Sequence, residues 1–164
     1  MKRITLLGAT GSIGRRTLEL VSSFPEEFSV VGLAARGSNV DLVADLCRKY
    51  SPRAVALLDG EARDQLARLL PAPRPELLAG ADGLAALARA VDADIVVSAL
   101  VGGVGLLPTM AAIQAGRTVA LANKETLVMA GPLMTAAARE RRQAPAGRLR
   151  AQRGLPVSRG PPPV

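Results

Sequence analysis

The segment that most constrains the fold of this chain is residues 8–14, which have the sequence Gly-Ala-Thr-Gly-Ser-Ile-Gly. It directly follows an apolar run at residues 4–7 and precedes a pattern typical of a helix start. Glycines let the backbone turn tightly and approach a ligand, and the amides at a helix N-terminus attract negative charge. The order strand, glycine turn, helix therefore indicates a phosphate cradle. An ordinary glycine-rich loop stays open as the alternative, because the spacing is not the common G-x-G-x-x-G.

Short apolar runs alternate with amphipathic stretches along the first 140 residues. Strands are predicted at residues 3–7, 29–34, 54–58, 76–78, 94–99 and 118–121, and helices at 12–22, 40–50, 61–69, 83–90 and 107–115. This alternation predicts an α/β fold, a Rossmann-like doubly wound parallel sheet with right-handed crossovers. Ligands of such sheets bind outside the carboxyl ends of the strands, where the glycine turn lies.

The composition excludes several classes of function. The chain has no histidine and one cysteine, so a disulfide framework and a Ser-His-Asp triad are excluded. Cys47 lies in the apolar stripe of the helix predicted at 40–50, which favours a buried hydrophobe over a nucleophile. No apolar run is long enough to span a bilayer. We expect a soluble, cytoplasmic protein without a membrane partner.

The excess of positive charge belongs to the end of the chain. Residues 141–164 contain six arginines, five prolines and no acid, whereas residues 1–140 have 15 basic and 14 acidic residues. A segment of this composition does not bury enough apolar surface to order itself, so a disordered basic tail at 141–164 is predicted behind one domain at 1–140. The alternative hypothesis is a small nucleotide-binding module whose basic tail contacts nucleic acid.

The end of the second predicted strand bears on the choice of nucleotide. NAD-binding sheets place an acid there, but this chain has Arg36, Gly37, Ser38 and Asn39. Arg36 can pair with a 2′-phosphate, and Ser38 and Asn39 can donate hydrogen bonds to it, which points to NADP. Taken singly, a solvated arginine and an asparagine that caps the next helix are equally good interpretations.

Two further segments follow strands at the same expected edge. Residues 94–105 form an apolar strand that opens into a second glycine-rich turn, which either lines the nicotinamide half of a cofactor or is merely a tight connection. Asn123, Lys124 and Glu125 follow the strand predicted at 118–121. They can bind ribose, amide or anionic groups, or they can cap a helix and complement its dipole.

Four strings together resemble the N-terminal, NADPH-binding domain of the 1-deoxy-D-xylulose 5-phosphate reductoisomerase family. They are residues 8–14, 37–40 (Gly-Ser-Asn-Val), 105–109 (Gly-Leu-Leu-Pro-Thr) and 120–128 (Ala-Leu-Ala-Asn-Lys-Glu-Thr-Leu-Val). The resemblance covers the chain from Lys2 to about Glu140. It implies an enzyme of the methylerythritol phosphate route to isoprenoids. Such an enzyme isomerises the sugar phosphate and reduces it with NADPH, uses Mn or Mg, and forms a homodimer.

The resemblance also implies roles for particular residues. The expected NADPH contacts are Thr10, Gly11, Ser12, Ile13, Gly37, Ser38, Asn39, Asn123 and Glu125, with Arg36 added from the charge argument above. Lys124 is expected to contact the substrate, 1-deoxy-D-xylulose 5-phosphate. Arg36 lengthens the loop before Gly37 relative to the family pattern.

The end of the chain departs from the family. Members continue into a strand that ends in a D-S-E-H motif with the metal ligands, and then into catalytic and helical domains. This sequence has none of these, so we expect no metal site and no turnover from the chain alone. A codon choice compatible with residues 142–159 encodes the family's continuation in another frame. A one-base frameshift near Arg141 is therefore our hypothesis for the tail.

Overall fold

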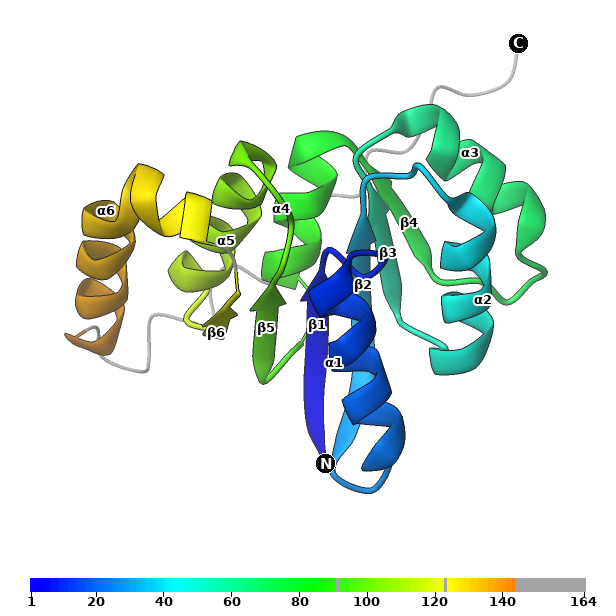
Figure 1. The fold of residues 1–164 in the computed structure, drawn as a ribbon, viewed down its shortest axis with the longest axis horizontal. Coiled ribbons are helices and arrows are strands. Elements are labelled where there is room, and N and C mark those ends of the chain that lie inside the picture. The colour runs from blue at the N-terminus through cyan, green and yellow to red at the C-terminus, as the bar shows by residue number, and fades with distance from the viewer. Residues whose placement is uncertain (91, 123, 144–164) are drawn as a thin grey trace, which may run out of the picture.

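The structure is a computed structural model that describes residues 1–90, 92–122 and 124–143. Six parallel strands form one sheet in the order β4-β3-β2-β1-β5-β6 (Figure 1). The strands are β1 (Lys2–Leu7), β2 (Phe28–Ala35), β3 (Ala54–Leu57), β4 (Glu76–Ala79), β5 (Ile95–Ser98) and β6 (Thr118–Leu121). The helices are α1 (Ser12–Ser23), α2 (Val40–Tyr50), α3 (Gly60–Leu69), α4 (Gly80–Ala90), α5 (Leu106–Gln114) and α6 (Lys124–Gln143), with a short 3₁₀ turn at Gly103–Gly105.

The predicted fold class is confirmed. Every strand and helix expected from the sequence is present, with ends displaced by at most three residues. Strand order reverses at β1, because β2, β3 and β4 lie on one side of it and β5 and β6 on the other. That reversal is the point at which doubly wound sheets bind ligands.

The helices cover the sheet in two layers. Buried side chains of α1, α2 and α3, such as Leu18, Val43 and Leu66, pack on one face against β1, β2 and β3. Leu84 and Ala112, from α4 and α5, pack on the opposite face with Val96 of β5. Burial of this apolar surface stabilises the fold in the near absence of aromatic residues.

The far end of the sheet is covered less completely. Val119 and Leu121 of β6 pack under α5 and α6, around the buried residue Met134. Thr118 and Ala120, which alternate with them along the strand, are exposed. Helix α6 is kinked at Ala130, shortly before Pro132, a residue that interrupts helical hydrogen bonding.

Charged residues join the strands at the amino edge of the sheet. The Arg3 guanidinium pairs with the Asp94 carboxylate at 3.0 Å and also with Asp92, which Arg117 approaches at 3.3 Å. The hydrogen bonds from Arg3 lower the pKa of Asp94 to about 2. This cluster therefore ties the start of β1 to the start of β5, at the edge opposite the glycine turn.

None of the helices described combines the length and the apolar character that crossing a membrane requires. Helix α6 continues to Gln143, three residues into the segment expected to be disordered. The prediction for residues 144–164 lies outside the described residues.

Candidate functional site

The glycine turn lies between β1 and α1, at the carboxyl edge of the sheet. Gly8 has φ +99°, and a Cβ on it would lie 2.6 Å from the Ala99 carbonyl oxygen at the end of β5. A Cβ on Gly14 would overlap the Gly8 carbonyl oxygen. Glycine is therefore required at both positions because neighbouring backbone segments lie too close to leave room for a side chain. Conformational freedom is not the only reason.

The turn is held against β2 and points the start of α1 at the edge of the sheet. The amides of Gly8 and Ala9 both donate to the Ala34 carbonyl oxygen at 2.8 Å. Gly11 occupies the N-cap of α1, and having no side chain it supplies no acceptor to the first amides of the helix. The start of α1 is therefore a position at which free helix amides can bind an anion. The candidate residues at this position are Thr10, Gly11, Ser12 and Ile13.

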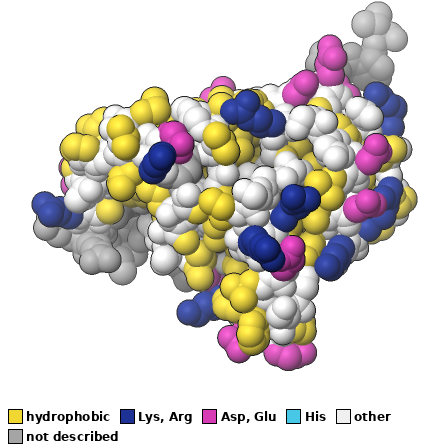
Figure 2. Space-filling model, in the orientation of Figure 1, with side chains coloured by type: hydrophobic (Ala, Val, Ile, Leu, Met, Phe, Trp, Pro, Cys, Tyr) yellow, Lys and Arg dark blue, Asp and Glu magenta, His cyan; other side chains and the backbone are white. Residues whose placement is uncertain are grey.

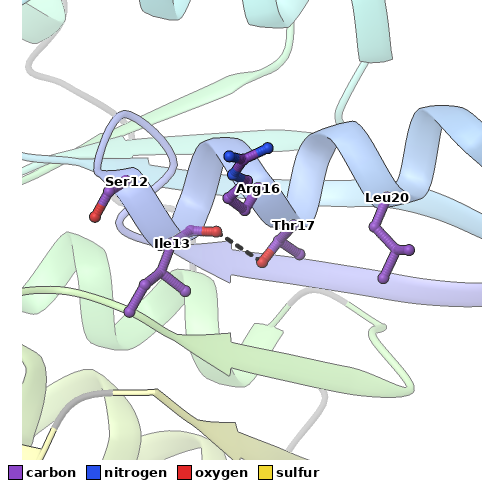
Figure 3. A pocket seen from close by; sticks show the side chains of 5 residues that line it. All are labelled: Ser12, Ile13, Arg16, Thr17 and Leu20. Atoms are coloured by element: carbon purple, nitrogen blue, oxygen red, sulfur yellow. Dashed lines mark hydrogen bonds between the residues drawn. The ribbon is translucent and has the colours of Figure 1, made fainter.

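A hollow of about 360 Å³ begins at this turn and follows α1. It is lined by Ser12, Ile13, Arg16, Thr17 and Leu20. Figure 3 shows Ser12 at the start of the helix, with Ile13, Thr17 and Leu20 further along it; the Thr17 hydroxyl donates to the Ile13 carbonyl oxygen at 2.9 Å. The two candidate contacts Ser12 and Ile13 are therefore accessible from solvent.

The loop after β2 brings a second group to the edge. The Arg36 guanidinium donates to the Val101 carbonyl oxygen at 3.0 Å, so it reaches across the turn to the end of β5. Gly37 has φ +106°, and a Cβ there would lie 2.6 Å from the Ala62 Cβ. Asn39 accepts from the Leu42 amide at 3.0 Å as the N-cap of α2. The capping interpretation of Asn39 is confirmed, and Ser38 is exposed beside it.

The segment after β5 is fixed by a buried pair of hydroxyls. The hydroxyl oxygens of Ser98 and Thr109 lie 2.7 Å apart, within hydrogen-bond distance. The Thr109 hydroxyl also donates to the Gly105 carbonyl oxygen at 2.5 Å. These bonds hold the 3₁₀ turn and the start of α5 on the sheet. No local sequence signal predicts the contact between these two hydroxyls, although the glycine-rich string around Gly103 marks the loop that they fix.

The segment after β6 contributes the third part of the edge. Lys124 is exposed and Glu125 is half-buried, both in the first turn of α6. Asn123 lies outside the described residues. The structure therefore places all the other candidate residues at one edge, after β1, β2 and β6.

Other reactive groups lie away from this edge. Burial raises the pKa of the Cys47 thiol to about 11, as expected for a packed hydrophobe. A second cavity, of about 440 Å³, lies near Cys47 and Pro73. Two arginines that line this cavity, Arg48 and Arg74, donate to carbonyl oxygens at the end of α3. These bonds cap the helix, so a structural role accounts for both arginines. Among the described residues, no three His, Cys, Asp or Glu side chains are grouped to hold a metal ion.

The reversal in strand order, the two helical layers and the glycine turn define this chain as a Rossmann-like α/β domain. The family model of 1-deoxy-D-xylulose 5-phosphate reductoisomerase matches residues 4–131. The chain belongs to this family.

Curated relatives of that name match most of this chain. The protein of Geobacter metallireducens is 51% identical over 140 residues, which cover 85% of this chain and 36% of the relative. The protein of Rhodococcus jostii is 49% identical over 136 residues, covering 83% of this chain and 33% of the relative. The chain thus spans about a third of the length of the relatives it matches.

Solved structures agree with this match. The Zymomonas mobilis reductoisomerase in complex with NADPH has a TM-score of 0.80 and 41% identity, over 85% of this chain and 36% of that one. A reductoisomerase in complex with NADPH, fosmidomycin and magnesium has a TM-score of 0.81 and 35% identity, over 86% and 35%. The family match gives no support to the alternative of a nucleic-acid-contacting tail.

Proposed function

We propose that residues 1–140 bind NADPH at the carboxyl edge of the sheet. The observation that supports this best is the glycine turn, in which Gly8 and Gly14 leave no room for a Cβ while α1 begins at the same edge. In this proposal Thr10, Gly11, Ser12 and Ile13 hold the pyrophosphate. The relative from Zymomonas mobilis, solved with NADPH, has the same fold over this region.

The preference for NADPH over NADH is assigned to the loop after β2. Arg36 supplies the positive charge for the adenosine 2′-phosphate, and Gly37 and Ser38 supply backbone and hydroxyl donors. Asn39 acts through the start of α2, because its side-chain oxygen already accepts from Leu42. Asn123 and Glu125 are assigned to the remaining contacts with the cofactor.

The proposed activity of the whole protein is that of its family. The substrate is 1-deoxy-D-xylulose 5-phosphate and the product 2-C-methyl-D-erythritol 4-phosphate, with NADPH supplying the hydride when bound. In this chain Lys124 is the proposed contact for the substrate, because its exposed ammonium group lies at the same edge as the cradle. An ammonium group there attracts a sugar phosphate.

The divalent cation of the family does not fit the described part of the chain. Mg²⁺ and Mn²⁺ need several oxygen ligands, and among the described residues no three His, Cys, Asp or Glu side chains are grouped to hold a metal ion. We therefore derive no metal-dependent step here and propose that this chain has no turnover alone. We further propose a cytoplasmic location, in keeping with the single cysteine, and no nucleic-acid or membrane partner.

Calorimetric titration with NADPH and NADH tests this proposal. We expect NADPH to bind more tightly, by about tenfold, since a charge-assisted contact to the 2′-phosphate is lost with NADH. An activity assay with substrate, NADPH and Mn²⁺ is expected to show no oxidation of NADPH. Equal affinities for the two nucleotides would contradict the assignment of the loop, and oxidation of NADPH would contradict the proposal that this chain has no turnover alone.

A further inference from the structure

Arg36 joins the two loops that flank the glycine turn. Its Nη2 atom donates to the Val101 carbonyl oxygen at 3.0 Å, across 65 positions of sequence. The two residues follow β2 and β5, and β1 lies between these strands in the sheet (Figure 1). Two strand spacings amount to about 10 Å, so only a long side chain spans them. We call this hydrogen bond the Arg36 bridge.

The backbone of the loop after β2 fixes one end of the bridge. The Arg36 carbonyl oxygen accepts from the Asp59 amide at 3.1 Å, and the Ala35 carbonyl oxygen accepts from the Leu58 amide at 3.0 Å. Both bonds tie this part of the loop to the end of β3. The side chain of Arg36 is therefore the part of the bridge that is able to move.

The loop after β5 forms the other end of the bridge. We call residues 99–102 the β5 loop. The Ala99 amide donates to the last carbonyl oxygen of β1 at 2.7 Å, and the Gly102 carbonyl oxygen accepts from an amide of the 3₁₀ turn at 3.4 Å. Val101 lies between these two anchors and is 68% exposed. The placement of its carbonyl group therefore depends on the bridge more than on the packing of its side chain.

The positive charge of Arg36 is accessible to an anionic ligand. The residue is exposed, and within residues 1–90, 92–122 and 124–143 no acidic side chain forms an ion pair with it. The Asp59 carboxylate accepts from the Glu61 and Ala62 amides as the N-cap of α3. Figure 2 shows basic and acidic side chains interspersed on the face in view, which offers an anion single cationic groups rather than a wide basic patch.

The bridge leaves most of the donor capacity of the guanidinium unused. A guanidinium has several N–H donors in a planar fork, and the bond to Val101 takes one of them. A phosphate can therefore accept from a pair of the remaining donors while the bridge stays in place. An ammonium group is a point charge without this fork, so a lysine would attract the phosphate without holding the loop.

A bound phosphate makes the bridge more populated. The bond from an exposed arginine has to offset the rotamer entropy of a long side chain, and the two contributions are of similar size. A phosphate that holds the guanidinium in place removes most of this entropic cost. A group that binds against the β5 loop then meets a loop that is already placed, and it binds more tightly.

We propose that Arg36 is a positioning residue that couples recognition of the 2′-phosphate to the placement of the β5 loop, against which the nicotinamide end of the cofactor lies. This inference rests on the proposed function, because it requires NADPH at this edge of the sheet. A dinucleotide whose pyrophosphate lies on the glycine turn extends toward the loops on both sides of β1. The 2′-phosphate thus strengthens binding of the opposite end of the same molecule.

Calorimetry of the 164-residue chain with four nucleotides tests the coupling. NADPH and NADH differ by the 2′-phosphate, as do adenosine 2′,5′-bisphosphate and AMP, which lack the nicotinamide end. The wild-type chain should prefer NADPH to NADH about tenfold but the bisphosphate to AMP only about threefold, because a half-nucleotide gains nothing from a placed β5 loop. Without coupling, the phosphate would have the same effect in both pairs.

The variant Arg36→Lys separates the charge from the bridge. It should show a preference of about threefold in both pairs, because the ammonium group attracts the phosphate but does not hold the loop. The matched control is Arg68→Lys, on the exposed surface of α3, which should behave as the wild type. Circular dichroism checks that both variants fold. If Arg36→Lys keeps the wild-type difference between the pairs, or Arg68→Lys removes it, the assignment to Arg36 is overturned.

Hydrogen exchange of residues 100–105 measures the coupling without the nicotinamide end. Saturating adenosine 2′,5′-bisphosphate should slow exchange there at least about threefold in the wild type, whereas AMP should not. Equal preferences in the two pairs of nucleotides, or no slowing by the bisphosphate, would overturn the coupling. The proposed function would then still stand if NADPH binds more tightly than NADH. If NADPH binds no more tightly than NADH, the proposed function and the coupling are both overturned.

Discussion

At the scale of single residues, the glycines of the turn are explained by contacts rather than by flexibility. A Cβ on Gly14 meets the Gly8 carbonyl and Ala9, whereas a Cβ on Gly60 meets nothing within 4 Å. We expect Gly14→Ala to lower the free energy of unfolding by about 1–3 kcal/mol, because backbone atoms have to move. Gly60→Ala is the matched control, expected within about 0.5 kcal/mol of wild type. Urea unfolding measures both, and equal effects would contradict the packing argument.

Arg36 is the residue to which we assign the preference for NADPH over NADH. Its guanidinium lies beside the Val101 carbonyl, at the edge where the proposed 2′-phosphate lies. Arg36→Ala is expected to weaken NADPH binding about tenfold and to leave NADH binding within about twofold, because only NADPH has the extra phosphate. Calorimetry measures both constants. Arg68→Ala, an exposed arginine of α3, is the control and should change neither. An equal loss of affinity for NADPH and NADH would show that Arg36 stabilises the fold and does not contact the 2′-phosphate.

At the scale of the elements, the Arg3 cluster makes the attachment of β1 to the start of β5 depend on pH. The pKa of Asp94 is lowered from 3.8 to about 2 by its hydrogen bonds to Arg3. A lowered pKa in the folded state stabilises the protein above the unfolded value, and this contribution is lost as the pH falls from about 4 to about 2.

We expect Asp94→Asn to be less stable than wild type at pH 7 and to lose less further stability between about pH 4 and pH 2. Glu26→Gln, a change in an exposed turn, is the control and should follow the wild-type curve. Urea midpoints across this range measure the effect. If the urea midpoints of Asp94→Asn and wild type fall in parallel as the pH is lowered, the ion pair of Asp94 with Arg3 does not make stability depend on pH.

Most helices and strands could be predicted from the sequence, whereas helix α6 and the contacts between distant segments could not. Apolar runs and helical stripes are local signals, so the strands, five helices and the glycine turn were predictable. Helix α6 was absent from the predicted helices, since its apolar residues lie on two sides and Pro132 interrupts it. The bond from Arg36 to Val101 joins residues 65 positions apart. It depends on the strand order, which periodicity does not give.

At the scale of the molecule, the described domain corresponds to about a third of the length of its relatives. The region that matches the Geobacter metallireducens relative covers 85% of this chain but only 36% of that relative. The hypothesis of a frameshift near Arg141 rests on the sequence alone, and resequencing the gene from an independent template tests it. An unshifted frame through residues 141–164 would contradict it.

A chimera tests whether the proposed NADPH-binding domain is competent for the chemistry of the family. Residues 1–140 are joined to the remaining part of the Geobacter metallireducens relative, which is 51% identical over the shared region. We expect the chimera to oxidise NADPH in the presence of substrate and Mn²⁺, because the relative's part then supplies the metal ligands that the resemblance implies. Lys124→Ala in the chimera should lower kcat/KM roughly 10- to 100-fold through loss of one charge-assisted contact, with NADPH affinity unchanged. Arg68→Ala serves again as the control. A chimera that folds and binds NADPH but does not turn over would place the defect within residues 1–140 rather than in the part that this chain does not match.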